Sequence, residues 1–163
     1  MFGNKGYGFK VNITNTFAMF GDLLHHSYIF ESIGNAVMIS AVIIGVLLIL
    51  FGKFNSNWKL YAIISLFLVM VPGFSYVYSI AYMLIPLVAF LNEKKTRKSD
   101  YIYLLLFILQ FGLFIAKKDE LFSQFEGSEL ALNITTLIES VVLLLMMAML
   151  YLCLLYTSPS PRD

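Results

Sequence analysis

The chain has 163 residues, of which 60% are hydrophobic and 13% charged, and its formal net charge is +1. Soluble domains are about 45–50% apolar, so this composition is typical of a protein that sits in lipid. The mean hydropathy of +0.82 agrees with that class. A net charge so close to zero excludes a broad basic surface for nucleic acid, and a single cysteine excludes a disulfide framework.

Long uncharged stretches alternate with short connectors that carry nearly all of the Lys and Arg. Residues 33–52, 60–92 and 101–116 hold no charged side chain, and residues 131–151 hold one, Glu139. A helix of about 20 apolar residues matches the roughly 30 Å hydrocarbon layer of a bilayer. The pattern predicts an all-α protein, a polytopic transmembrane helical bundle of about five membrane helices over residues 33–152.

Residues 1–32 are more polar and are predicted to form an outward-facing loop that contains an amphipathic helix. Asn15 or Thr16 is the expected N-cap, and Phe17, Phe20 and Leu24 follow at helical spacing on one side. Such a helix lies on a membrane surface or packs beneath a loop.

Two adjacent histidines, His25 and His26, follow Asp22 in this segment. Neighbouring side chains on a helix point about 100° apart, so one metal ion would need ligands from elsewhere. We therefore expect no metal, and no cofactor. The histidines are candidates for binding a phosphate or a sugar hydroxyl in an outward-facing cavity, and the alternative is a polar patch on an exposed helix.

The first crossing is expected at residues 33–51, and Trp58 in the following connector would anchor it at the lipid–water interface. Residues 60–91 would measure about 48 Å as one helix, which is too long for one crossing. Pro72-Gly73 interrupts the stretch, because Pro lacks a backbone donor and Gly permits unusual dihedrals. We predict a short helix at residues 60–71, a turn, and a second helix at residues 75–91.

Hydroxyl side chains recur after this turn at Ser75, Tyr78, Ser79 and Tyr82, positions that share one face of an α-helix. Ser75 and Tyr78 are candidates for the wall of an outward-facing substrate cavity. The alternative is an aromatic belt combined with small residues at a helix contact.

The last two membrane helices are predicted at residues 101–116 and 132–152, separated by an acidic loop. Glu139 lies within the second of them, and a carboxylate at mid-bilayer costs about 2.5–3.5 kcal/mol, which makes it a functional candidate by default. Because it lies only about two turns from Asn133, an interfacial or structural role is the alternative.

The Lys and Arg of the connectors predict the orientation. One side would hold Lys53, Lys59, Lys94, Lys95, Arg97 and Lys98, and the other Lys5, Lys10, Lys117 and Lys118. The larger group marks the cytoplasmic side. Residues 1–32, the turn at Pro72-Gly73 and the acidic loop would then face away from the cytoplasm.

Residues 153–163, CLLYTSPSPRD, change abruptly from membrane helix to a Ser/Pro run. They resemble the reading-frame translation of a transposase-type sequencing adapter, which would make them a non-native tail. The alternative is a short polar cytoplasmic tail. Since residues 1–15 also read like the interior of a loop, the chain is expected to be a fragment cut at both ends.

Two motifs occur in a definite order along the chain. Gly8-Phe9-Lys10-Val11-Asn12 and Asn15-Thr16 precede an apolar helix. A short helix then ends in Val71-Pro72-Gly73-Phe74-Ser75, before Tyr76 to Tyr82, Ile85-Pro86 and a basic loop. Over residues 8–92 this order resembles the C-terminal half of glycosyltransferase family 87, which comprises polytopic enzymes of the GT-C architecture.

The resemblance implies transfer of mannose or a related sugar from a polyprenol-phosphate carrier to a glycan or lipid acceptor, outside the cytoplasm. It implies membrane lipid and a polyprenol-phosphate-linked sugar donor as partners, no nucleic acid, and a location in a bacterial cytoplasmic membrane. The family's catalytic acid lies in an upstream outward loop, so no catalytic residue is assigned and the chain's own enzymatic status stays open. The turn at Pro72-Gly73 and Tyr78 would lie near the substrate cavity, with Lys5, Lys10, His25 and His26 as donors to the phosphate.

Two other functions fit the same pattern. One is a polysaccharide polymerase or ligase of the O-antigen type, which is also polytopic with outward loops. The other is a transporter-like membrane protein without catalysis, for which paired broken helices in two similar halves would be typical.

Overall fold

The computed structural model of the chain is all-helical and describes residues 10–52, 54, 56–73, 75, 77–93, 100–122 and 129–157. For residues 77, 116–122, 129–132 and 156–157 it describes the backbone alone. The elements are α1 (Ile13–Leu23), α2 (Ser27–Phe51), α3 (Asn57–Met70), the 3-10 helix η2 (Val77–Met83), α4 (Leu84–Leu91), α5 (Tyr101–Phe122) and α6 (Glu129–Thr157). Residues 1–9, the basic cluster at 94–98 and the final Ser/Pro run at 158–163, on which several predictions fall, lie outside the described residues.

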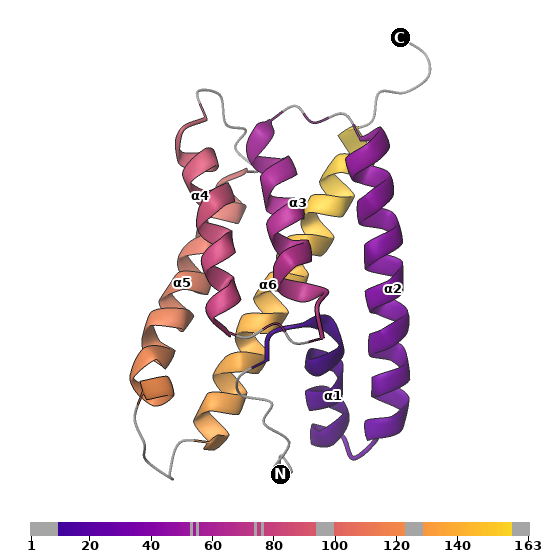
Figure 1. Ribbon diagram of the computed structural model, residues 1–163, viewed down its shortest axis with the longest axis vertical. Coiled ribbons are helices and arrows are strands. Elements are labelled where there is room, and N and C mark those ends of the chain that lie inside the picture. The colour runs from indigo at the N-terminus through magenta and orange to yellow at the C-terminus, as the bar shows by residue number, and fades with distance from the viewer. Residues whose placement is uncertain are drawn as a thin grey trace.

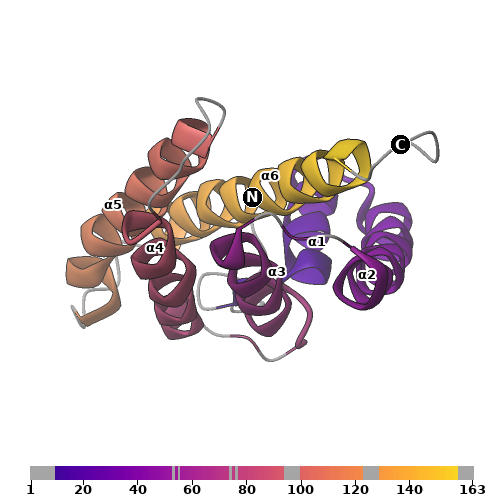
Figure 2. The same ribbon diagram turned by 90° about the horizontal axis from the view of Figure 1, so that it is seen from above.

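Helix α6 is a packing partner of four other helices. It crosses the bundle diagonally behind α3 (Figure 1) and, seen from above, extends along the whole row formed by α5, α4, α3 and α2 (Figure 2). It packs against α1, α2, α3 and α5. Helices η2 and α4 pack instead against α3.

The helix ends gather at two opposite ends of the bundle. The α1–α2 turn, the end of α5 and the start of α6 lie at the lower end, and the end of α2, the start of α3, the end of α4 and the start of α5 lie at the upper end (Figure 1). Helix α3 stops part-way down, and α1 lies in the lower half beside its end (Figure 1). The sequence predicts the same grouping of the helix ends, except that the break after α3 lies part-way along the bundle rather than at its lower end.

Helix α1 is packed inside the bundle rather than lying along a surface. It forms a tight antiparallel hairpin with α2, where a Cβ at Gly34 would lie 2.8 Å from the Cβ of Phe17. Ile13, Thr16 and Met19 are buried. The predicted helix thus exists, but the predicted N-cap is wrong: the helix begins at Ile13 and Asn12 caps it.

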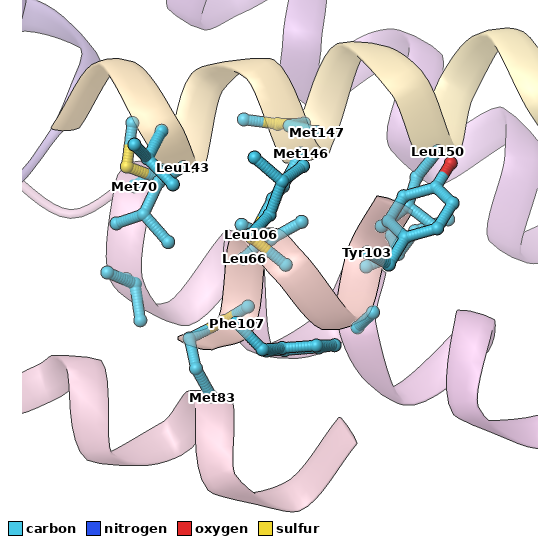
Figure 3. Close-up of a cluster of buried hydrophobic side chains, with 14 of the residues drawn as sticks. Leu66, Met70, Met83, Tyr103, Leu106, Phe107, Leu143, Met146, Met147 and Leu150 are labelled. Carbon is cyan, nitrogen blue, oxygen red and sulfur yellow. The ribbon is translucent and has the colours of Figure 1, made fainter. Parts of the chain in front are cut away.

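The main core lies where α3, η2 and α5 meet α6. Figure 3 shows Leu66 and Met70 of α3, Met83 of η2, Tyr103, Leu106 and Phe107 of α5, and Leu143, Met146, Met147 and Leu150 of α6. Long, flexible methionines fill the irregular space between helices that cross at different angles. The apolar seam between α5 and α6 belongs to this core.

Trp58 is fully buried at the upper end, so its predicted place at a lipid interface is wrong. Its ring makes edge contacts with Phe90 of α4 and Tyr103 of α5, at centroid distances of 5.2 and 5.1 Å. Beside it, Lys59 Nζ lies 3.2 Å from Asp100 Oδ1, and both side chains are buried. Lys59, which the sequence analysis counts among the cations of the cytoplasmic side, is therefore paired with a carboxylate inside the protein.

The break at Pro72-Gly73 is confirmed, but the helix after it differs from the prediction. Val77–Met83 is a 3-10 helix, and an α-helix follows only from Leu84. Side chains repeat every three residues in a 3-10 helix. Ile80 and Met83 of η2 are accordingly both buried.

Among the described helices, two are long and apolar enough to cross a membrane: Ser27–Phe51 and Asn133–Leu155. Asn57–Met70, Tyr78–Leu91 and Tyr101–Ile115 are apolar but shorter. Core helices of soluble proteins and signal sequences can have the same length and composition. Only 17% of the apolar part of α2 is buried, which is too little for a core helix.

Several helix boundaries differ from the prediction, including the starts of α3 at Asn57 and of α6 at Glu129. Helix α2 begins at Ser27 rather than at residue 33, and α5 continues to Phe122, past residue 116. Helix α6 continues to Thr157, so the sequence boundary at residue 153 does not coincide with a helix end.

Gly45 of α2 allows α3 and α6 to approach. A Cβ at Gly45 would overlap the ring of Phe67 and crowd the hydroxyl of Tyr151, whereas nothing lies within 4 Å of a Cβ at Gly112.

We expect Gly45→Leu to lower the free energy of unfolding by about 1–3 kcal/mol, the usual cost of overpacking. Gly112→Leu is the matched control and should leave stability equal or higher, because Leu favours helix. Thermal unfolding followed by circular dichroism in detergent measures both, and equal midpoints would contradict the close contact.

Candidate functional site

The start of α1 docks on the break between α3 and η2. The Val11 N–H donates to the Ser75 carbonyl at 2.9 Å, and the Asn12 side-chain amide donates to the Gly73 carbonyl at 3.3 Å. A helix end leaves carbonyl groups without intrahelical partners, and these two bonds satisfy carbonyls of the break. Segments about 60 residues apart in the chain thus form one structural unit.

Asn12 holds this junction through both ends of its amide. Its Oδ1 accepts hydrogen bonds from the Asn15 N–H at 2.7 Å and from the Thr14 hydroxyl at 2.9 Å, while its Nδ2 faces Gly73. Its carbonyl accepts from the Thr16 N–H and hydroxyl. Because donors surround the oxygen and a carbonyl faces the nitrogen, the network fixes the orientation of the amide.

A polar pocket of about 230 Å³ lies beside the junction. Its lining residues are Lys10, Asn12, Thr14, Asn15 and Ala18 from the start of α1, Glu31 and Asn35 from α2, and Gly73 from the break. Lys10 and Glu31 bring one charge of each sign, and the others bring amide and hydroxyl groups. The volume is small beside the about 300–1,000 Å³ usual for ligand pockets, so it suits a polar head group rather than a whole lipid.

An apolar groove of about 390 Å³ lies between α2 and α6. It is lined by Ile33, Ala36, Val37, Ser40, Ala41 and Ile44 of α2 and by Leu144, Met147, Ala148 and Tyr151 of α6. The two hydroxyl groups of the groove donate to backbone carbonyls: Tyr151 to the Ala41 carbonyl and Ser40 to the Ala36 carbonyl, both at 2.8 Å. An uncharged wall of this kind suits an alkyl chain.

The groove and the pocket are separate sites. Each residue turns a helix by about 100°, which puts Glu31 and Asn35 roughly opposite Ala36 and Ser40 around α2. One ligand could therefore fill both only by bending around the helix.

His25 and His26 lie in the turn between α1 and α2, and both are exposed. His25 has a φ of 60°, a left-handed conformation that His adopts more readily than most residues. Asp22 accepts a hydrogen bond from the Ser27 hydroxyl at 2.7 Å. Neither histidine lines the polar pocket, and in the described part of the chain no three His, Cys, Asp or Glu residues are grouped to hold a metal.

Ser75 and Tyr78 do not share a face. Ser75 is buried, with its hydroxyl 2.6 Å from that of Ser79, whereas Tyr78 is 71% exposed. Ser75 lies before η2, which begins at Val77, so the two residues do not belong to one helix and their spacing does not align them. The predicted hydroxyl wall is absent from the described residues, and Ser75 joins the junction through its backbone carbonyl.

Glu139 is fully buried in α6 rather than at a wet boundary. Asn133, Thr136 and Ser140 of the same helix are buried with it, as is Gln110 of α5. Glu139 does not line the polar pocket. The structure thus places the sequence candidates at three separate locations: the α1–α2 turn, the η2 region and the buried face of α6.

Glu31 and Asn35 are the pocket residues that sequence reasoning missed. Both lie before or near the predicted start of the first crossing at residue 33. A usable signal was their spacing of four residues, which puts two polar side chains on one face of an otherwise apolar helix.

We expect Asn12→Ala to lower the free energy of unfolding by about 2–4 kcal/mol, because it removes an N-cap and leaves the Gly73 carbonyl without its donor. Asn12→Asp keeps the cap but loses that donor, so it should also destabilise the protein. Chemical unfolding in detergent measures both variants. An Asp variant as stable as the unsubstituted protein would show that the bond to Gly73 contributes nothing.

Comparison with protein-family models, with curated proteins and with solved structures found no match to this chain. The resemblance to glycosyltransferase family 87 therefore stays a prediction from the motifs.

Proposed function

We propose that this chain is an integral membrane protein whose helices α2, α3, η2–α4, α5 and α6 all lie in lipid. The support is the exposed apolar surface along these helices. It includes Ile43, Leu47 and Leu50 of α2, Leu68 of α3, Val88 and Leu91 of α4, Leu105 and Ile108 of α5, and Ile138 and Leu145 of α6. Soluble monomers rarely expose apolar patches larger than a few hundred Å². Lipid is the solvent that makes such a surface favourable.

The shorter helices fit this proposal as parts of a bundle. Helix α3 ends within the bundle, and α1 satisfies the backbone at its end. Irregular backbone at membrane depth is tolerated where protein buries it.

The topology test uses two exposed positions at opposite ends, His25 and Asn92, in a Cys153→Ser background. A membrane-impermeant maleimide added to intact cells should label His25→Cys and not Asn92→Cys. Permeabilised cells should label both, which is the control. Labelling of both positions from outside, or recovery of the chain without membranes, would contradict the proposal.

Within that membrane protein, we propose the function of a polyprenol-phosphate-sugar-dependent glycosyltransferase, of which this chain is a C-terminal membrane part. One observation carries it. The two motifs that resemble the family, around Asn12 and around Gly73, dock on each other and line one polar pocket.

The pocket chemistry fits a phosphosugar head group. The Lys10 ammonium and the Asn35 amide are donors for phosphate oxygens, and hydrogen bonds to a charged group of this kind are the strong ones. The Glu31 carboxylate repels phosphate but accepts hydrogen bonds from sugar hydroxyls. We therefore assign Lys10 to the phosphate and Glu31 to the sugar.

Sugar transfer also requires a base that activates the acceptor hydroxyl and donors that stabilise the departing phosphate. Lys10 supplies such a donor. The base is assigned to no residue of this chain, in keeping with the resemblance, which puts it upstream.

Binding of a radiolabelled decaprenyl-phosphate-mannose to the chain in nanodiscs tests this function. A charge-assisted hydrogen bond contributes about 1.5–3 kcal/mol, so Lys10→Ala should weaken binding about 10- to 100-fold. His25→Ala, outside the pocket, is the matched control and should bind normally. Absence of saturable binding, or equal affinity for decaprenol without phosphate, would contradict the assignment.

A transporter-like function without catalysis is the second candidate. The broken helix at Pro72-Gly73 favours it, because discontinuous helices form substrate and ion sites in many transporters. Sugar transfer by the complete protein, measured with the same labelled donor, would favour the enzyme over this alternative.

A further inference from the structure

The polar pocket beside the start of α1 contains two opposite charges that are not paired with each other. Lys10 and Glu31 both line it. Among the residues that the structure describes, neither of the two forms an ion pair, whereas Lys59 and Asp100 form one at 3.2 Å. The pocket therefore offers both a cation and a carboxylate to one ligand.

The two charged residues lie at different heights along the α1–α2 hairpin. Helices α1 and α2 are antiparallel, and Gly34 of α2 lies against Phe17 of α1. Lys10 precedes the start of α1, whereas Glu31 lies nearly one turn closer to the α1–α2 turn than Gly34 does. At 1.5 Å of rise per residue, these positions separate the two backbones by about 8–10 Å along the hairpin.

This order matches that of a lipid-linked sugar. In the proposed topology the α1–α2 turn lies at the end of the bundle that faces away from the cytoplasm (Figure 1). Lys10 is therefore deeper in the membrane than Glu31. The phosphate of a lipid-linked donor is joined to the lipid chain and the sugar lies beyond it, which agrees with phosphate at Lys10 and sugar at Glu31.

The charges of the pocket favour a sugar that is itself positively charged. The phosphodiester of such a donor carries one negative charge, which Lys10 balances. A neutral sugar leaves the Glu31 carboxylate without a counter-charge in the same pocket as the phosphate, and like charges repel. A protonated amino group on the sugar supplies that counter-charge. It also donates a charge-assisted hydrogen bond to the carboxylate, which is stronger than the bond from a neutral hydroxyl.

We propose that the pocket selects a donor whose sugar carries an amino group, with the ammonium bound by Glu31 and the phosphate by Lys10. This inference rests on the proposed function, because it names the class of sugar that the donor carries. A phosphatidylethanolamine head group combines the same two charges, so the experiment has to distinguish the two sources.

Binding of two radiolabelled donors to the chain in phosphatidylglycerol nanodiscs tests the inference. Decaprenyl-phosphate-mannosamine and decaprenyl-phosphate-mannose differ only in an amino group that replaces one hydroxyl. At low salt and at a pH that protonates the amine, the amino-sugar donor should bind about 3- to 5-fold more tightly. The ratio is modest because Glu31 is exposed and water screens the pair. The N-acetylated donor has no positive charge and should bind like the mannose donor.

Three variants separate the contributions of the two charges. Glu31→Gln removes the charge but keeps an acceptor oxygen, so it should abolish the preference and leave the affinity for the mannose donor equal or higher. Glu93→Gln, outside the pocket, is the matched control and should keep the preference. Lys10→Ala should weaken both donors by the same factor, because both carry the phosphate. Circular dichroism checks that each variant is folded.

Failure of this inference and failure of the proposed function give different results. Equal affinity for the two donors, with both bound more tightly than decaprenol, would overturn the amino-sugar inference and leave the proposed function standing. No saturable binding of either donor would overturn both. A preference that survives Glu31→Gln would overturn the assignment to Glu31. Displacement of the amino-sugar donor by an equal concentration of short-chain phosphatidylethanolamine would also overturn the inference, because the pocket would then bind a phospholipid head group.

Discussion

The hydrogen-bonding needs of an interrupted backbone determine how the N-terminal part of this protein folds. Pro72-Gly73 ends α3 inside an apolar bundle, where free carbonyl groups are costly. The segment before α1 supplies the missing donors, from the Val11 backbone and the Asn12 side chain. This explains why α1 lies beside the end of α3, and why its start and the break share one polar pocket.

Helix α6 presents two different seams along its length. Its upper part packs through Leu143, Met146 and Leu150 against apolar neighbours, while its lower part buries Glu139 and Ser140. The upper seam is explained by packing alone. The lower seam buries polar groups, which lowers stability wherever such a group lacks a hydrogen-bond partner.

Composition and the Pro-Gly pair were enough to predict an all-helical chain with a break after α3. Boundaries moved because exposed polar residues such as Glu31 and Asn35 can belong to a helix that is otherwise apolar. The burial of Trp58 could not be predicted, since its partners Phe90 and Tyr103 come from later helices. The pocket was hidden for the same reason: its residues come together only when α1 docks on the break.

The ion pair between Lys59 and Asp100 has a consequence for biogenesis. In the proposed topology, Lys59 emerges from the ribosome 41 residues ahead of its partner and carries an unbalanced charge while α3 inserts. It can therefore act as a retention signal on the cytoplasmic face at that stage. When α5 packs against α3, Asp100 neutralises Lys59 and both side chains become buried. A positive charge that helps to orient the chain during insertion is therefore no longer exposed in the folded protein.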